Sequence, residues 1–288
     1  MKERIEDMKF SVLLSVYKNE KPEYLKIALE SIVNQTLMPN EIVIVQDGPL
    51  TSALEIVINK FKSKYPKLVR VLCFEKNRGL GPALHDGVLS CKYEWIARMD
   101  TDDIAYPCRF EKQFEYLAEH PNVAMVGSWI TEFSNDSAHP DTITKLPVTY
   151  EEIKSYAKRR NPFRHMTVIY KKSAVLDSGN YRDFLWFEDY DLWVRMLQKG
   201  YIVANIPEVL VNVRADDEMF ARRGGWKYWK QDMKFQRILY KSGFISFYHL
   251  SSNILIRFTM RLIPSELRKT VYSKFLRKSI DNNKGNIK

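Results

Sequence analysis

The sequence YEWIARMDTDD, at residues 93–103, joins a short apolar run to three closely spaced aspartates. Its first part, residues 93–99, predicts a buried strand that runs into a turn. Asp100, Asp102 and Asp103 follow directly, and their charges repel one another unless a cation joins them. Hard divalent cations such as Mg²⁺ or Mn²⁺ take oxygen ligands and fill their remaining positions with water and substrate phosphates. The cluster therefore predicts a metal-bridged phosphate substrate.

An acidic turn also has a plainer interpretation. Asp102 or Asp103 would then cap the next helix from a solvated turn, because aspartate is a common capping residue. The position after a predicted parallel strand favours a binding site, since open α/β sheets bind ligands at the carboxyl ends of their strands.

The chain before this stretch alternates apolar runs with helical patterns. Near-continuous apolar runs at residues 10–17, 41–45 and 69–74 predict three buried strands. Helical patterns follow them at residues 22–33, 54–61 and 84–90. Strands that are apolar throughout and alternate with helices indicate an α/β fold with a mostly parallel central sheet and helices on both faces.

Polar loops follow the predicted strands. Residues 17–20, 46–48, 77–81 and 100–103 would all lie along one edge of the sheet, which is the candidate nucleotide site. The sequence has no glycine between the first strand and Gly48, so it lacks a glycine-rich phosphate cradle there. A metal would then have to hold the phosphates.

Five motifs, in this order, resemble the family 2 inverting glycosyltransferases of the GT-A fold. They are VYKN at 16–19, QDG at 46–48, NRGLGPAL at 77–84, DTDD at 100–103 and EDYDLW at 188–193. The resemblance covers about residues 9–215. It implies transfer of a sugar from a nucleoside diphosphate sugar, with UDP as the expected nucleotide, as in the bacterial transferases that build O antigen and capsule polysaccharides.

The resemblance also implies roles for individual residues. The nucleotide sugar is assigned to Tyr17, Glu20, Asp47, Arg78, Asp100 and Asp102. Asp102, Asp103 and His165 are the expected ligands of Mn²⁺ or Mg²⁺, although a single histidine in such a position is also often a packed residue. Glu188, Asp191 and Trp186 are expected in the acceptor and sugar pocket, although aromatic residues in such segments are more often part of the core.

The reaction itself requires a base, because an acceptor hydroxyl is a poor nucleophile at neutral pH. The resemblance assigns this role to Asp189, which stands between the aromatic residues 184–187 and the helical pattern that follows. Attack from the face opposite the departing diphosphate inverts the anomeric centre. The alternative role for Glu188 and Asp189 is to stabilise the helix start, as acidic residues in a first turn often do.

Composition limits the class of protein. A chain of 288 residues with 45% hydrophobic content can form one large α/β domain and an appendage. Cys73, Cys91 and Cys108 are scattered without metal-ligand spacing and predict buried free thiols in a reducing compartment. The N-terminal residues 1–7 are too acidic for a signal peptide, so a cytoplasmic protein is expected.

The basic charge is concentrated at the C-terminus. Residues 219–288 hold sixteen Lys and Arg against three Asp and Glu, mixed with many aromatic residues. We therefore expect a catalytic domain at 1–218, with a nucleotide-sugar half near 9–103 and an acceptor half near 104–218, and a basic amphipathic helical tail at 219–288. Such a composition is typical of a segment that lies on an anionic membrane, here the inner face of the cytoplasmic membrane, where lipid-linked saccharides or glycans would be the acceptors. A solvated basic helix face is the plainer alternative, and no nucleic-acid motif accompanies the charge.

Two other classes of protein remain open. A sugar nucleotidyltransferase would use a related sheet but would be expected to carry a glycine-rich loop after the first strand, and residues 15–20 contain no glycine. A non-catalytic basic protein that binds membranes or nucleic acid would be expected to have lost the carboxylates, all of which this chain retains.

Overall fold

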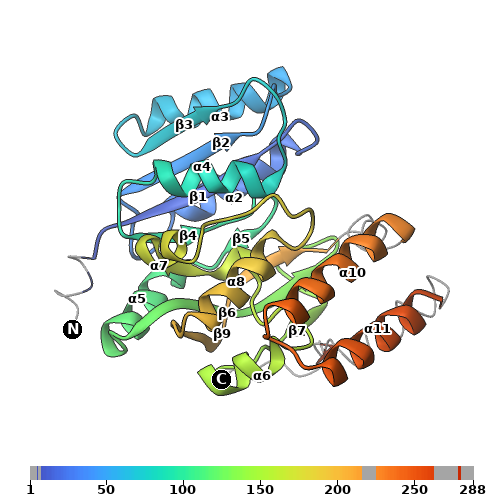
Figure 1. Ribbon diagram of the computed structural model, residues 1–288. Coiled ribbons are helices and arrows are strands. Elements are labelled where there is room, and N and C mark those ends of the chain that lie inside the picture. Colours follow the sequence, from blue (N-terminus) through green and yellow to red (C-terminus); the bar gives the residue numbers. More distant parts are fainter. Residues whose placement is uncertain (1–4, 6–7, 216–224, 263–277, 280–288) are drawn as a thin grey trace.

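The computed structural model describes residues 5, 8–215, 225–262 and 278–279. One ten-stranded sheet runs through these residues, with helices on both of its faces (Figure 1). The strands follow the order β10-β7-β6-β8-β4-β1-β2-β3, and β9 pairs with β6 and β5 off this path.

The N-terminal half of the sheet is parallel, as the apolar runs predict. β1 (Phe10–Val16) lies between β2 (Glu41–Gln46) and β4 (Trp95–Arg98), and β3 (Val69–Cys73) is the outer neighbour of β2. Alternate side chains of β1 enter different cores: Leu13 lies on one face of the sheet, and Val12 and Leu14 lie on the other. Both faces are therefore covered, which explains why the strand is mostly apolar.

Three helices connect the parallel strands. α2 (Pro22–Val33) and α3 (Ser52–Lys64) cover one face, and α4 (Leu80–Ser90) covers the other. α2 begins at a proline, which fits the first turn because its missing N–H has no helical partner. α4 packs closely on β1, since a Cβ added at Gly87 would lie 2.6 Å from Leu13 Cδ1. The predicted strands and helices of this half are confirmed.

The second half of the sheet is mixed. β8 (Ile169–Lys171) runs antiparallel to both β4 and β6 (Val123–Phe133), and β6 pairs in parallel with β9 (Ile202–Arg214). The remaining elements of this half are β5 (Ile104–Ala105), α5 (Arg109–Glu119), β7 (Thr142–Thr144), α6 (Tyr150–Tyr156), the 3₁₀ helix η1 (His165–Thr167), α7 (Lys172–Asp177) and α8 (Glu188–Gln198).

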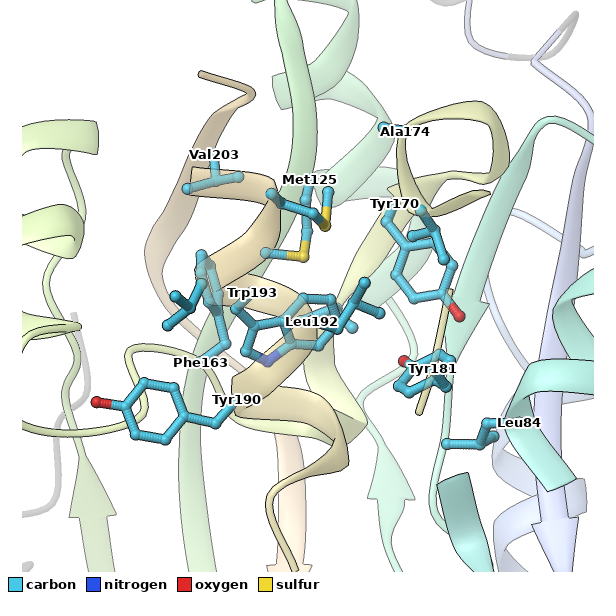
Figure 2. Packing of buried hydrophobic residues seen from close by; sticks show 14 of the residues in the cluster. Leu84, Met125, Phe163, Tyr170, Ala174, Tyr181, Tyr190, Leu192, Trp193 and Val203 are labelled. Atoms are coloured by element: carbon cyan, nitrogen blue, oxygen red, sulfur yellow. The ribbon is translucent and has the colours of Figure 1, made fainter. Parts of the chain in front are cut away.

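An aromatic core fixes α8 on the sheet. Figure 2 shows Trp193 of α8 among Phe163, Tyr170 and Tyr181, and its ring centroid lies 6.0 to 6.3 Å from theirs. Trp193 is fully buried. The plainer prediction for the aromatic residues of this region, that they form core, therefore holds for Trp193. Its packing holds α8 against the sheet.

Two antiparallel helices follow the mixed half: α10 (Gly225–Lys241) and α11 (Phe247–Leu262). Phe235 of α10 is fully buried, with its ring centroid 4.9 Å from that of Phe187 and 4.7 Å from that of Tyr190. α10 thus shares the core of the preceding residues. The predicted boundary at 218 falls within residues 216–224, which lie outside the described part of the chain. β10 (Lys278–Ser279) pairs antiparallel with β7.

Two predictions from composition can be compared with the structure. Within the described residues, every helix is too short or too polar to cross a bilayer. All three cysteines are free, as predicted, but the prediction that all are buried is wrong: Cys91 is buried, Cys108 is intermediate and Cys73 is exposed. Cys73 is the last residue of β3, the final strand of the order, so it has a neighbouring strand on one side only and fewer residues cover its thiol.

Candidate active site

The candidate site lies where the strand order reverses. β1 has β2 on one side and β4 on the other, so the connections after β1 and β4 leave the sheet in opposite directions at a topological switch point. Ligands of open α/β sheets bind at such points. A side-chain hydrogen bond joins the two loops, because the Thr101 hydroxyl donates to the carboxylate of Glu20. The structure therefore brings the predicted loops at 17–20 and 100–103 together.

Asp100, Asp102 and Asp103 form one cluster. Each offers a carboxylate oxygen, and these three atoms lie within 4.8 Å of one another. Burial, with the charges of Asp100 and Glu20, raises the pKa of Asp102 to about 7. Burial and the same crowding raise the pKa of Asp103 well above its usual range. A bound cation would relieve this repulsion, and three carboxylate oxygens suit Mg²⁺ or Mn²⁺.

The structure does not support the alternative that these aspartates cap a helix. Asp103 is 2% exposed, and its Oδ1 accepts a hydrogen bond from the Arg214 amide at 2.9 Å. The next element is the short strand β5, and the next helix, α5, begins at Arg109 without a side-chain cap. The cluster is therefore a partly buried group between two strands and not a solvated helix start.

Arg98, the last residue of β4, is a buried counter-charge beneath the cluster. Its guanidinium forms an ion pair with Asp100, and its side chain is 2% exposed. Burial alone would lower the pKa of Arg98, but the charge and hydrogen bond of Asp100, together with Tyr181 and Asp103, outweigh burial, and the pKa is raised. The carbonyl of Arg98 in turn accepts a hydrogen bond from the guanidinium of Arg109, which is also buried. Arg98 therefore pairs directly with Asp100, whereas Asp102 and Asp103 form no ion pair in the part of the chain that the structure describes.

The loops after β2 and β3 are tied together by Asp47. Its Oδ1 accepts from the Arg78 amide at 2.7 Å, and its Oδ2 accepts from the Gly79 amide at 2.9 Å. A Cβ added at Gly48 would lie 2.5 Å from the Asn77 nitrogen, and φ at Gly48 is +88°, so only glycine allows this approach. Asp47 is 4% exposed and supports the loop, and its direct contact with a nucleotide stays a prediction.

Two more of the predicted nucleotide residues lie on the surface. Tyr17 is 38% exposed at the end of β1. The Arg78 guanidinium lies 3.6 Å from the centroid of the Phe74 ring and 2.6 Å from Asp86 Oδ2. Both side chains are accessible at the predicted edge of the sheet, and their nucleotide contacts stay predictions.

Two carboxylates start α8 in different environments. Glu188 is 8% exposed, and burial, followed by the charge of Asp189, raises its pKa to about 8; Asp100 contributes to the same shift. Asp189 is half-buried and accepts two hydrogen bonds, from Asn161 Nδ2 at 2.7 Å and from the Tyr190 amide at 2.6 Å. The bond from Tyr190 is what the capping alternative expects, whereas the bond from Asn161 orients the carboxylate from another loop. N–H donors favour the charged form of a carboxylate, which a base needs.

The other residues predicted for the acceptor pocket are held by neighbours. Asp191 is 4% exposed and pairs with Arg195, whose Nη2 lies 2.8 Å from its Oδ2. Trp186 has an unusual φ of +69°, and its ring centroid lies 5.1 Å from that of Tyr228 in α10. Backbone strain of this kind at a bulky residue persists only where packing holds it. Contacts of either residue with an acceptor stay predictions.

His165 does not belong to the aspartate cluster. Its Nε2 lies 2.9 Å from the Tyr181 hydroxyl, and its ring packs edge-on against Trp193. Burial, with the charge of Arg98, lowers the pKa of His165 well below its usual value, so the ring is neutral. This is the packed arrangement that a single histidine often adopts, and its role as a metal ligand stays a prediction.

The raised pKa of Glu188 predicts a pH-dependent stability. Between the usual value of 4.5 and about 8, the unfolded chain has lost the proton that folded Glu188 keeps. Folding stability therefore falls as the pH rises through this window. We expect Glu188→Gln to melt above the wild type near pH 8 and close to it below about pH 5, because glutamine carries no charge to bury. Scanning calorimetry at both pH values checks this, and an equal difference at both would contradict it.

Two site residues were missed by the sequence predictions. Arg98 is the one charged residue at the end of a predicted apolar strand, two residues before Asp100. This position could have predicted a buried cation that pairs with the aspartates. Asn161 lies 28 residues from Asp189 and precedes Pro162 in a loop, so no spacing in the sequence connects the two.

The chain is similar in sequence to known proteins. The family model for Glycosyl transferase family 2 matches residues 11–182. The chain is 41% identical over 268 residues to the amylovoran biosynthesis glycosyltransferase AmsE of Erwinia amylovora, covering 92% of this chain and 98% of the relative. It is 36% identical over 270 residues to the UDP-Gal:alpha-D-GlcNAc-diphosphoundecaprenol beta-1,3-galactosyltransferase of Escherichia coli, covering 94% and 97%.

Solved structures share the fold at low identity. The mannosyltransferase PcManGT of Pyrobaculum calidifontis, in complex with GDP-Man and Mn²⁺, has a TM-score of 0.63 at 15% identity, covering 94% of this chain and 77% of that one. Residues 1–349 of TarS from S. aureus, in complex with UDP-GlcNAc, give 0.61 at 16% identity, covering 93% and 74%. The predicted GT-A type of α/β fold is confirmed, and with the family match and the two full-length relatives, the chain belongs to glycosyl transferase family 2.

Proposed function

We propose that this enzyme transfers a hexose, with inversion, from a UDP-sugar to a lipid-linked saccharide or glycan during synthesis of an envelope polysaccharide such as O antigen or capsule. The observation that carries the proposal is the cluster of Asp100, Asp102 and Asp103 at the switch point between β1 and β4. The Escherichia coli relative, which spans nearly the whole chain, is named for UDP-Gal and a diphosphoundecaprenol acceptor.

The three aspartates suit a divalent cation, Mn²⁺ or Mg²⁺. Asp102 and Asp103 would hold it, because Arg98 already pairs with Asp100 and the other two carboxylates form no ion pair among the described residues. When bound there, the ion would neutralise charge on the diphosphate leaving group. The site fits this role because both carboxylates are crowded enough to have raised pKa values without it.

Asp189 is proposed as the general base. N–H groups of Asn161 and Tyr190 donate to it and orient its carboxylate at the start of α8. The charge of Asp100 contributes to the raised pKa of the adjacent Glu188, which supports a position of this helix start near the aspartate cluster. Burial and the charge of Asp189 raise the pKa of the neighbouring Glu188 to about 8, so Glu188 keeps its proton at neutral pH and is the less suitable base. A single base that deprotonates the acceptor opposite the leaving group supports inversion.

The acceptor class indicates where the enzyme would work. We propose a cytoplasmic enzyme peripheral to the inner face of the membrane, since an acceptor on a polyprenyl diphosphate carrier stays in the bilayer. Nucleic acid is not a proposed partner, because the basic residues accompany no nucleic-acid motif.

The donor is tested by thermal stabilisation. Purified enzyme is heated with each of a panel of nucleotide sugars, with and without Mn²⁺. We expect a UDP-sugar, with UDP-galactose the first to test, to raise the melting temperature only when the cation is present. Stabilisation by GDP-sugars but not by UDP-sugars would overturn the donor assignment.

A further inference from the structure

The exposed face of α10 carries a continuous basic stripe. Lys227, Lys230, Lys234, Arg237 and Lys241 recur at intervals of three and four residues, and all five side chains are exposed. The opposite face, with Phe235 and Leu239, is buried. The single acidic residue of the helix, Asp232, is fully buried and pairs with Arg257, so it does not neutralise the stripe.

The neighbouring helix, α11, presents its apolar side chains to solvent. Phe247, Tyr248 and Phe258 are 68%, 70% and 46% exposed. Two polar side chains of the helix face the protein instead: Asn253, which is 4% exposed, donates to the Lys158 carbonyl, and Arg257 donates to Asp232 and to the Arg159 carbonyl. A surface helix normally has the reverse arrangement, so this face requires a cover.

The two helices form one antiparallel unit at an end of the molecule (Figure 1). Asn253 Nδ2 lies 2.9 Å from Gln236 Oε1, and the ring centroids of Tyr240 and Phe247 lie 6.2 Å apart. Both contacts pair the later residues of α10 with the earlier residues of α11. The basic stripe and the aromatic side chains therefore stand on adjacent helices that are fixed to the catalytic core through Phe235.

We propose that the exposed faces of α10 and α11 together form a docking surface for an anionic phospholipid bilayer. This proposal deepens the proposed membrane location and rests on it. Long basic side chains bind anionic headgroups while exposed aromatic rings enter the interface, which is the composition of helices that lie on membranes. A second copy of the chain fits less well, because two like-charged stripes would repel each other.

Deletion of the tail would be a poor test. Removal of α10 would expose Phe184, Phe187 and Tyr190, whose rings pack on Phe235, and the enzyme would lose its core together with the stripe. Substitutions on the exposed face avoid this problem. Lys230, Arg237 and Lys241 are suitable positions because all three point away from the buried face and lie outside the candidate active site.

The electrostatic part is tested by vesicle flotation of the full chain. We expect binding to vesicles that contain phosphatidylglycerol but not to pure phosphatidylcholine, and weaker binding in high salt. The triple variant Lys230→Gln, Arg237→Gln, Lys241→Gln should lose binding by on the order of 10²-fold, at about one tenfold step for each 1.4 kcal/mol and about 1 kcal/mol for each cation. The matched control, Lys60→Gln, Lys62→Gln, Lys67→Gln, changes three exposed cations on and after α3 and should bind like the wild type.

The apolar part has its own variant. Tyr248→Ser combined with Phe258→Ser should keep salt-sensitive binding but lose the binding that remains in high salt. Transfer to a water-soluble acceptor analogue, measured in parallel, should be unchanged in all these variants, so failure of the docking surface is distinguishable from failure of the proposed reaction. The proposal is overturned if the full chain does not float with anionic vesicles, if both triple variants lose binding equally, or if light scattering shows that these residues hold two copies together.

Discussion

Asp189→Asn should lower turnover by about two to four orders of magnitude, the usual contribution of a general base. Asparagine keeps the size of the side chain and can still accept a hydrogen bond from the Tyr190 amide, but it cannot take the proton of the acceptor hydroxyl. Donor affinity should barely change, because the aspartate cluster and the nucleotide loops belong to other elements. Steady-state turnover and calorimetric binding of UDP, measured on the same preparation, separate the two effects.

The helix-start alternative predicts the reverse for this variant. Asparagine stabilises a helix start about as well as aspartate, so little activity would be lost. The matched control is Asp183→Asn, an exposed aspartate in the segment before α8, which should keep full turnover. A variant at Asp189 that retains more than about a tenth of wild-type turnover would move the base elsewhere. Glu188 would then be the first candidate, because Asp191 is already paired with Arg195.

Asp102→Ala should abolish both metal-dependent donor binding and transfer. Arg98 compensates Asp100, so removal of Asp102 leaves Asp103 as the one uncompensated carboxylate of the cluster. A single carboxylate is a weak site for a hard cation. Titration of UDP into the variant, with and without Mn²⁺, should give the same weak binding in both cases, whereas the wild type should bind more tightly with Mn²⁺.

Folding of this variant provides a separate check. Asp102 carries a raised pKa because it is buried beside Asp100 and Glu20, so its removal relieves repulsion in the metal-free protein. The melting temperature without metal should therefore equal or exceed that of the wild type. Asp136→Ala, at an exposed loop position, is the control and should keep metal-dependent binding. Unchanged metal-dependent binding of UDP by the Asp102 variant would refute the metal assignment.

The parallel half of the fold could be predicted because its signals are local. A strand such as β1 is buried on both faces, so most of its positions require apolar side chains, and the apolar run ends where the loop begins. The motif that follows β4 could be placed in the same way, because parallel strands end at one edge. Glu20 and Thr101 meet across the switch point for this reason.

The remaining features depend on contacts between distant residues. The Asn161 amide reaches Asp189 from another loop, and Phe235 reaches Phe187 from a helix that the sequence indicated only as a basic tail. The sequence also could not predict that Asn253 and Arg257 of α11 face the protein. A helical pattern shows that one face is apolar but does not show which face meets the protein. Tertiary packing decided these points.

The proposed reaction is tested most directly by sugar transfer to a lipid-linked acceptor. Purified enzyme is incubated with a radiolabelled UDP-sugar and a saccharide-diphospholipid, and the label is followed into the organic phase. We expect label to enter this phase only when the acceptor and a divalent cation are both present, and we expect Asp189→Asn and Asp102→Ala each to prevent it. No transfer from any UDP-sugar, combined with synthesis of a UDP-sugar from UTP and a sugar phosphate, would rule out the proposed transferase and identify a nucleotidyltransferase instead.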